Sequence, residues 1–140
     1  MEQVGQEAEP LKKGTQILEL EHSGLDEITT DRRFLKNILY NLLSNAFKYS
    51  PEDGKVIVKS NVLNGRATIS VVDHGMGIPP EDQEHIFDRF FRAHNVVNIH
   101  GTGLGLTVVK KYADLLAGTL TFSSNSEKGT VFTLELPLKN

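Results

Sequence analysis

The sequence predicts an α+β domain built as two layers: a mixed, largely antiparallel sheet of about five strands, and three helices on one face of that sheet. The first observation is a pair of hairpins, over 55–72 and 119–136, in which apolar and polar residues alternate on either side of a short turn. The second is that other segments repeat their apolar residues every three or four positions, as helices do. Strands joined by tight turns pair antiparallel, which distinguishes this class from parallel sheets covered on both faces.

The N-terminal third contains one strand and one long helix. A chain of 140 residues, 39% of them hydrophobic, is long enough to form one folded core. Residues 1–14 have no periodicity, so we expect a disordered lead-in or linker stub before a domain over 15–140. A strand over 16–21 is followed by Asp31, whose side chain is suited to capping a helix over 32–49. The Ser-Pro pair and the glycine that come next are expected to end that helix.

The first hairpin joins strands over 55–62 and 67–72 through an Asn-Gly pair, which supplies the turn chemistry of a tight hairpin. Two prolines and the acidic residues after them then favour a helix start, and this helix is expected to run toward Phe91. The stretch over 93–100 has no clear period, so we expect it to be mobile.

The C-terminal third is predicted to contain one helix and the second hairpin. A glycine-rich segment over 101–105 opens the helix, which extends through Leu116 and has Gly118 as its expected C-cap. Strands over 119–124 and 130–136 then pair around a glycine turn.

The composition excludes several classes of function. Fifteen Lys and Arg against eighteen Asp and Glu leave a net charge of −3, without the basic excess that binding to a nucleic acid backbone relies on. The absence of Cys excludes a disulfide framework, thiolate metal sites and a cysteine nucleophile. No apolar run approaches the ~20 residues of a membrane span, and the acidic, polar N-terminus is unlike a secretory signal. We therefore expect a soluble domain.

Asparagines form a row on the predicted helix over 32–49. Asn37, Asn41, Asn45 and Lys48 fall within a stripe of roughly 80°, beside the apolar face that is expected to enter the core. Amide oxygens can ligate Mg²⁺ directly or through water, and a neighbouring lysine can meet a phosphate. The alternative is an ordinary solvated polar face, although such a face usually holds Glu, Lys and Arg rather than Asn, a weak helix former.

Two glycine-rich loops also suggest ligand binding. Asp73 directly follows a strand, and Gly75 and Gly77 after it let the backbone approach a planar ligand closely, while the carboxylate can accept from an exocyclic amine. The glycines of 101–105 precede a helix N-terminus, which favours an anion such as phosphate. This second loop matches neither a dinucleotide fingerprint nor a P-loop. A plain strand-to-helix turn and a flexible hinge are the respective alternatives.

Five segments, taken together and in order, resemble the N, G1, F, G2 and G3 boxes of sensor histidine kinases. They are NLLSNAFKYS (41–50), DHGMGI (73–78), IFDRFFR (86–92), GTGLGL (101–106) and EKGTVF (127–132). The resemblance covers roughly 31–137 and is to the catalytic ATP-binding domain. It implies the Bergerat fold, a two-layer α/β sandwich shared by the GHKL ATPases, with a flexible ATP lid over 93–100.

The resemblance also implies roles for individual residues. Asn45 would hold Mg²⁺ with Asn41 assisting, and Arg92 would stabilise the transferred γ-phosphoryl group, so these three are the implied catalytic residues. Asp73 would bond the adenine amino group. The other residues implied to line or support the nucleotide site are Lys48, Tyr49, Gly75, Gly77, Ile78, Phe91, Gly101, Thr102, Gly103, Leu104, Gly105, Leu106, Gly129 and Thr130.

The implied function is to bind ATP with Mg²⁺ and to donate the γ-phosphoryl group to a histidine, as a sensor histidine kinase does in two-component signalling. No long heptad pattern with a histidine precedes Asp31, and His22 lies in a short, turn-like context. We therefore expect the phosphoacceptor on a dimerisation domain of a longer parent kinase, with a response regulator as an indirect partner. We expect the domain itself to be cytoplasmic and monomeric, and the parent could be anchored to a membrane.

Two other functions are compatible with these motifs. A related ATPase, of the superfamily that includes the gyrase B subunit and the heat-shock chaperones, has Glu where Asn41 stands, to activate water. The second is a nucleotide-binding regulatory module without catalysis. The sequence departs from the kinase pattern at His74, where Asn is usual, in its short lid, and at Ala117, which replaces the first residue of a frequent Gly-Gly pair.

Overall fold

The computed structural model describes residues 16–24, 31–50, 54–75, 77–78, 80–86, 105–125 and 127–137. The expected lead-in, the end of the helix predicted to reach Phe91, the expected lid over 93–100 and the glycines at 101 and 103 lie outside these residues.

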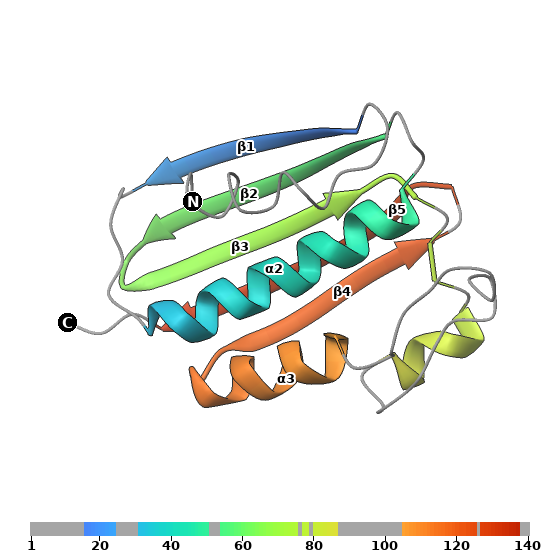
Figure 1. The fold of residues 1–140 in the computed structure, drawn as a ribbon. Coiled ribbons are helices and arrows are strands. Elements are labelled where there is room, and N and C mark those ends of the chain that lie inside the picture. The colour runs from blue at the N-terminus through green and yellow to red at the C-terminus, as the bar shows by residue number, and fades with distance from the viewer. Residues whose placement is uncertain are drawn as a thin grey trace.

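Five strands form one mixed sheet (Figure 1). In chain order they are β1 (Ile17–Gly24), β2 (Lys55–Leu63), β3 (Arg66–Asp73), β4 (Thr119–Asn125) and β5 (Gly129–Pro137). Their spatial order is β1-β2-β3-β5-β4, with β1 parallel to β2 and every other neighbouring pair antiparallel. This arrangement confirms the predicted α+β class and its largely antiparallel sheet. The first strand runs three residues beyond its predicted end at 21, because it pairs with β2 along its whole length.

Two α-helices within the described residues lie on one face of the sheet (Figure 1). They are α2 (Arg32–Tyr49), which has the predicted bounds, and α3 (Gly105–Leu115). The segment predicted to begin a third helix is a 3₁₀ helix over Pro80–His85, and its expected continuation toward Phe91 lies outside the described residues. No helix in the part of the chain that the structure describes has the length and apolarity of a membrane span.

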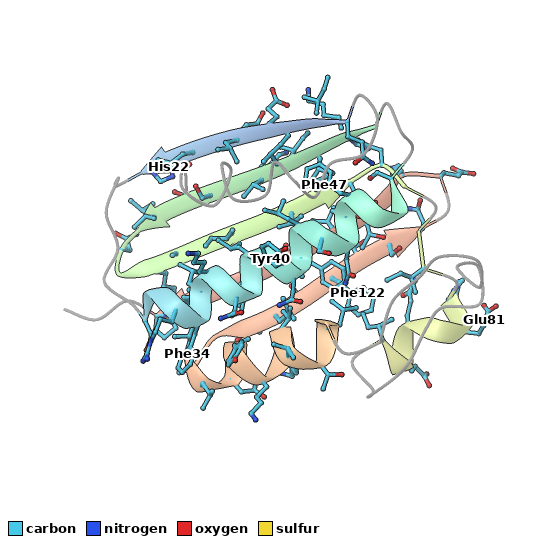
Figure 2. All side chains as sticks on the ribbon, in the orientation of Figure 1. His22, Phe34, Tyr40, Phe47, Glu81 and Phe122 are labelled. Atoms are coloured by element: carbon cyan, nitrogen blue, oxygen red, sulfur yellow. The ribbon has the colours of Figure 1, made fainter. Side chains whose placement is uncertain are left out.

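The core lies between the sheet and the helices that cover it, chiefly α2 and also α3, as the alternating strands predict. Phe47 of α2 is fully buried between the helix and the strands (Figure 2), while Tyr40 on the outer side of the helix is 44% exposed. Alternate residues of β3 are buried, including Ala67, Ile69 and Val71. The buried side chains therefore recur with the period of the element that carries them, which is two residues in a strand and three to four in a helix.

The end of α3 differs from the prediction by one residue. Ala117, and not Gly118, has left-handed backbone geometry, with φ of 57°. The Gly118 N–H donates to the Ala113 carbonyl at 2.8 Å and the Ala117 N–H to the Asp114 carbonyl at 3.0 Å, which is the bonding pattern of a Schellman C-cap. Gly118 has a different role, because a Cβ there would lie 2.6 Å from the Leu136 side chain and 2.9 Å from the Glu135 carbonyl oxygen. The glycine allows β5 to pass close to this turn.

Candidate functional site

One end of the molecule collects the segments that were singled out in the sequence. The C-terminal ends of α2, β3 and β4, the start of β5 and the N-terminal end of α3 all point to the same side, where the 3₁₀ helix also lies (Figure 1). This follows from the topology, because β3 and β4 run in one direction and β5 in the other. The sheet thus brings Asp73, Ser124 and Thr130 together at the same end of three neighbouring strands.

Asp73 is the buried acidic group of this end. The residue is 7% exposed, and its Oδ1 accepts a hydrogen bond from the Gly75 N–H at 2.9 Å. Burial raises the pKa of the Asp73 carboxyl, and hydrogen bonds from the Gly75 and Thr130 backbone and the nearby His74 only partly offset that rise. None of the ion pairs found among the described residues includes Asp73. A buried carboxylate without a cationic partner is suited to accept from a ligand's N–H group.

The start of β5 lies directly beside the end of β3 in the sheet. Thr130 is paired with Asp73 across the two strands, and Gly129 before it has a φ of 89°. A Cβ on Gly129 would collide with the Asp73 carbonyl oxygen and would lie 2.8 Å from the His74 Cα. Glycine is therefore required here for two separate reasons, its positive φ and the close approach of the neighbouring backbone.

The backbone of Ile78 is held from both sides. Its N–H donates to the Ser124 Oγ at 2.7 Å, and its carbonyl accepts from the Gln83 Nε2 at 3.0 Å. Gln83 Nε2 also donates to the Ser124 carbonyl at 3.2 Å, and the Ser124 and Thr130 hydroxyls lie 2.8 Å apart. These contacts tie the loop after β3 to the end of β4, the start of β5 and the 3₁₀ helix.

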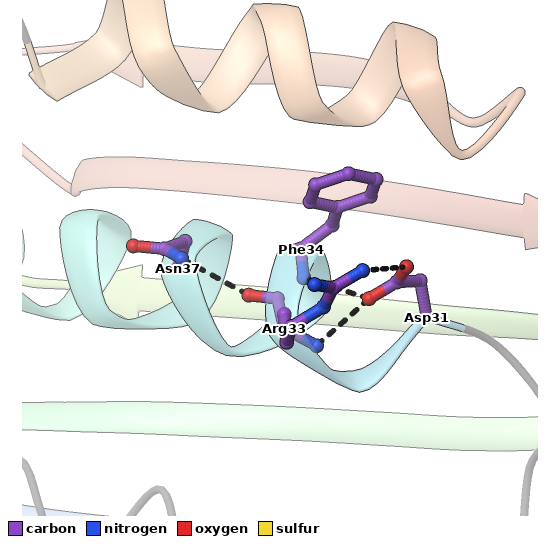
Figure 3. A network of polar contacts seen from close by, with 4 residues as sticks. All are labelled: Asp31, Arg33, Phe34 and Asn37. Carbon is purple, nitrogen blue, oxygen red and sulfur yellow. Dashed lines mark hydrogen bonds and ion pairs between the residues drawn. The ribbon is translucent and has the colours of Figure 1, made fainter.

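The asparagine row lies along the side of α2. The Asn37 amide donates to the Arg33 carbonyl at 3.1 Å (Figure 3), and the Asn41 amide donates to the Asn37 carbonyl at 2.8 Å. Each Nδ2 is thus bound to the helix's own backbone, which leaves the amide oxygen of each side chain as an acceptor. Asn45 is half-buried, and no hydrogen bond to its side chain is found among the described residues.

The two ends of α2 are fixed by different polar contacts. At the N-terminus the Asp31 carboxylate accepts from the Arg33 and Phe34 N–H groups (Figure 3), and a hydrogen bond from the Arg33 side chain is the main cause that lowers the pKa of Asp31. At the C-terminus the buried Gln16 donates through its Nε2 to the Phe47 carbonyl at 2.8 Å and to the Ser50 carbonyl at 3.3 Å. This second contact stabilises the turn that carries the end of the asparagine row.

The structure brings together part of the predicted site. Asp73, Gly75, Ile78 and Thr130 form one connected group through the contacts above, with Gly77 between them at a φ of 72°. Asn41 and Asn45 lie on the adjoining helix, and Leu106 is half-buried in the first turn of α3. Six other predicted residues lie outside the residues that the structure describes: Phe91, Arg92, Gly101, Thr102, Gly103 and Leu104. For Lys48 and Tyr49 the structure describes the helical backbone but not the side chains.

Three residues that support this group were not predicted. Ser124 and Gln83 hold Ile78, and Gln16 holds the end of α2. Ser124 had only the weak signal of a hydroxyl residue at the end of a strand, and Gln83 is one of several polar residues in its segment. Their partners are up to 46 positions away, so no local pattern identifies them.

The chain is similar in sequence to proteins of a known family. A family model described as "Histidine kinase-, DNA gyrase B-, and HSP90-like ATPase" matches residues 30–140. Sensor protein BceS of Halalkalibacterium halodurans is 41% identical over 115 residues, which are 81% of this chain and 34% of that protein. Histidine protein kinase DivJ of Caulobacter vibrioides is 37% identical over 126 residues, which are 89% of this chain and 21% of that protein.

Solved structures give the same result for the fold. The mycobacterial sensor histidine kinase MprB is similar with a TM-score of 0.77 at 28% identity, over 99% of this chain and 90% of that one. Full-length ShkA, in complex with AMPPNP, is similar with a TM-score of 0.80 at 28% identity, over 99% of this chain and 29% of that one. The chain spans about a third or less of the length of the two curated relatives described above.

Proposed function

Because this chain belongs to the family of histidine kinase-, DNA gyrase B- and HSP90-like ATPases and is the catalytic ATP-binding domain of a sensor histidine kinase, we propose that it binds ATP with Mg²⁺ and donates the γ-phosphoryl group to a histidine. That histidine belongs to a dimerisation domain of the parent kinase, and the reaction is the first phosphoryl transfer of two-component signalling. The observation that carries the proposal is the buried Asp73 carboxylate, which forms no ion pair among the described residues.

The adenine end of the proposed site is formed around Asp73. Its carboxylate accepts from the adenine amino group, and burial makes that hydrogen bond stronger than it would be in water. Gly75 and Gly77 give the loop its close approach to the base, and Ile78 supplies an apolar surface beside it. Thr130 holds Asp73 from the opposite strand.

The metal end of the proposed site is formed by two members of the asparagine row, Asn41 and Asn45. Mg²⁺ prefers oxygen ligands and is usually bound through a few protein groups together with the phosphates of its nucleotide. The Asn41 amide fits this requirement, because its nitrogen is bound to the helix backbone and its oxygen remains as an acceptor. Within the described residues no cluster of His, Cys, Asp and Glu could hold a metal without a nucleotide. We assign Asn45 as the Mg²⁺ ligand and Asn41 as a supporting oxygen donor. Mg²⁺ held there would neutralise part of the phosphate charge.

The phosphate end combines a helix N-terminus with cationic side chains. The N-terminus of α3, with Gly105 as its first residue, faces this end of the molecule, and the positive end of a helix dipole favours an anion (Figure 1). Phe91, Gly101, Thr102, Gly103, Leu104 and Leu106 complete the nucleotide site in this proposal. Lys48 and Tyr49 bind along the nucleotide, and Arg92 stabilises the charge that develops on the transferred group.

The residues favour transfer to a histidine over hydrolysis. A hydrolytic ATPase needs a base to activate water, and an amide such as that of Asn41 cannot accept a proton at neutral pH. The chain then needs an acceptor from outside, which in this proposal is the histidine of the dimerisation domain. We further propose that the isolated domain is monomeric and cytoplasmic, and that a response regulator, as an indirect partner, receives the phosphoryl group. A dimeric mass in light scattering at micromolar concentration would contradict the monomer.

Calorimetric titration of ATP, with and without Mg²⁺, tests the site. We expect the wild type to bind, Asn45→Ala to lose the Mg²⁺ dependence, and Asp73→Asn to weaken binding with or without the metal. Asn37→Ala is the matched control, because Asn37 lies one turn of the row away, is exposed and contacts only its own helix. No binding by the wild type at millimolar ATP would leave a non-catalytic module as the better interpretation.

A further inference from the structure

The loop that carries Ile78 is held by side chains from two other segments, those of Ser124 and Gln83. Both polar groups of its backbone are occupied, the N–H by the Ser124 hydroxyl and the carbonyl by the Gln83 amide. The Gln83 amide nitrogen has two hydrogens, and it donates to two carbonyls from different segments, those of Ile78 and Ser124. A glutamate or a leucine of similar size could not make this pair of bonds.

Resting on the proposed function, we propose that Gln83 and Ser124 are positioning residues that fix the Ile78 backbone and so set the shape of the base end of the nucleotide site. The Ile78 side chain is half-buried against the core, so its place depends on the backbone that carries it. Ser124 also contacts the Thr130 hydroxyl, and Thr130 in turn holds Asp73. Because Thr130 meets Ser124 through its hydroxyl and Asp73 through its backbone, the contact between Thr130 and Asp73 remains when the Ser124 hydroxyl is removed.

This arrangement separates two kinds of base recognition. Because the Ile78 N–H and carbonyl are already bonded within the protein, Ile78 contributes apolar contact to any purine. Polar discrimination between adenine and guanine is left to the Asp73 carboxylate. Loss of the Gln83 or Ser124 contacts should therefore weaken the binding of ADP and of GDP by similar factors. The ratio of the two Kd values should then stay unchanged. A change at Asp73 itself should alter that ratio.

The test uses Gln83→Glu, which keeps the size of the side chain but removes both donors, and Ser124→Ala, which removes the hydroxyl. The controls are their exposed neighbours, Glu84→Gln and Ser123→Ala. Each protein is titrated with ADP and GDP, and hydrogen exchange is followed at the Ile78 amide. We expect the Kd for ADP to rise about five- to tenfold in both test variants, the factor for one or two lost hydrogen bonds. We also expect faster exchange of the Ile78 amide in Ser124→Ala and no change in the controls.

Each result decides between the proposal and its alternatives. ADP affinity equal to that of the wild type in folded Gln83→Glu and Ser124→Ala overturns the positioning role and leaves the proposed function intact. Failure of the wild type to bind ADP overturns the proposed function first, and the inference with it. If Gln83→Glu does not fold, the pair Ser124→Ala and Ser124→Thr decides, because only the threonine retains a hydroxyl. Recovery of ADP affinity in Ser124→Thr supports the role, and equal weakening in both overturns it.

Discussion

Gly129 lies against the backbone of Asp73 on the neighbouring strand, and there is no room for a Cβ atom unless one strand moves. A Cβ at this position would collide with the Asp73 carbonyl oxygen and would lie 2.9 Å from the carbonyl carbon. The contact places the start of β5 against the end of β3, where the buried carboxylate of the site lies. A glycine in the C-terminal hairpin thus determines the geometry of an acidic residue more than fifty positions earlier.

Gly129→Ala tests this contact against a matched control. Gly65 also has a positive φ, of 74°, but a Cβ there would meet nothing within 4 Å. We expect Gly65→Ala to cost about 1 kcal/mol for the left-handed backbone. Gly129→Ala should cost about 1–3 kcal/mol more, because β5 must shift away from β3. Urea unfolding measures both, and equal losses in the two variants would contradict the close approach.

Substitutions at the end of α3 should have opposite effects. Ala117 has left-handed geometry, and Ala117→Gly should raise the free energy of unfolding by about 0.5–1 kcal/mol because glycine adopts that geometry without strain. Gly118→Ala should lower it, because the new methyl would lie 2.6 Å from the Leu136 Cδ2. Thermal unfolding of both variants checks the assignment of the cap, and a loss of stability in Ala117→Gly would refute it.

Asp73 and Asp31 should show opposite pH dependence of stability. Burial raises the pKa of Asp73, so the folded state holds this proton more tightly than the unfolded state, and stability falls as pH rises through the folded pKa. The pKa of Asp31 is lowered, chiefly by the Arg33 side chain, so its contribution is present at neutral pH and is lost on acidification.

Asn substitutions expose this difference. Asp31→Asn should lose stability relative to the wild type as the pH rises from about 2 to about 5, while Asp73→Asn should gain it as the pH rises from about 4 to about 7. Unfolding midpoints at several pH values measure both trends. The assignment fails if Asp73→Asn shows no change in its stability relative to the wild type across that range.

Gln16 should stabilise the domain more than a surface ion pair does. The residue is 5% exposed, and its amide bonds the Phe47 carbonyl at the end of α2. Gln16→Ala leaves buried carbonyl groups without this donor and should cost about 1–3 kcal/mol. Lys55→Ala is the comparison, because Lys55 and Glu19 form a 2.7 Å ion pair that is partly exposed, and its loss should cost under about 1 kcal/mol. Equal losses in urea unfolding would show that Gln16 is not needed as a cap.

Much of the fold could be predicted because its determinants are local. Apolar residues at helical spacing predicted α2 with the bounds that the structure shows, and alternation predicted the two hairpins. The Asn64-Gly65 turn has the positive φ values that its residues favour. The order of the five boxes likewise identified the family, because such motifs are short and contiguous.

Other features depend on contacts between distant segments. Periodicity says which side of a strand is buried but not which strand lies beside it, so the parallel pairing of β1 with β2 came only from the tertiary structure. The same holds for Ser124 and Gln83 on Ile78 and for Gln16 on α2. Local patterns in the sequence predicted the five strands and both long helices, identified the family and pointed to the residues expected to meet the nucleotide. The packed sheet decided which other residues hold them in place, because hydrogen bonds between distant segments form only where the whole fold brings their donors and acceptors together.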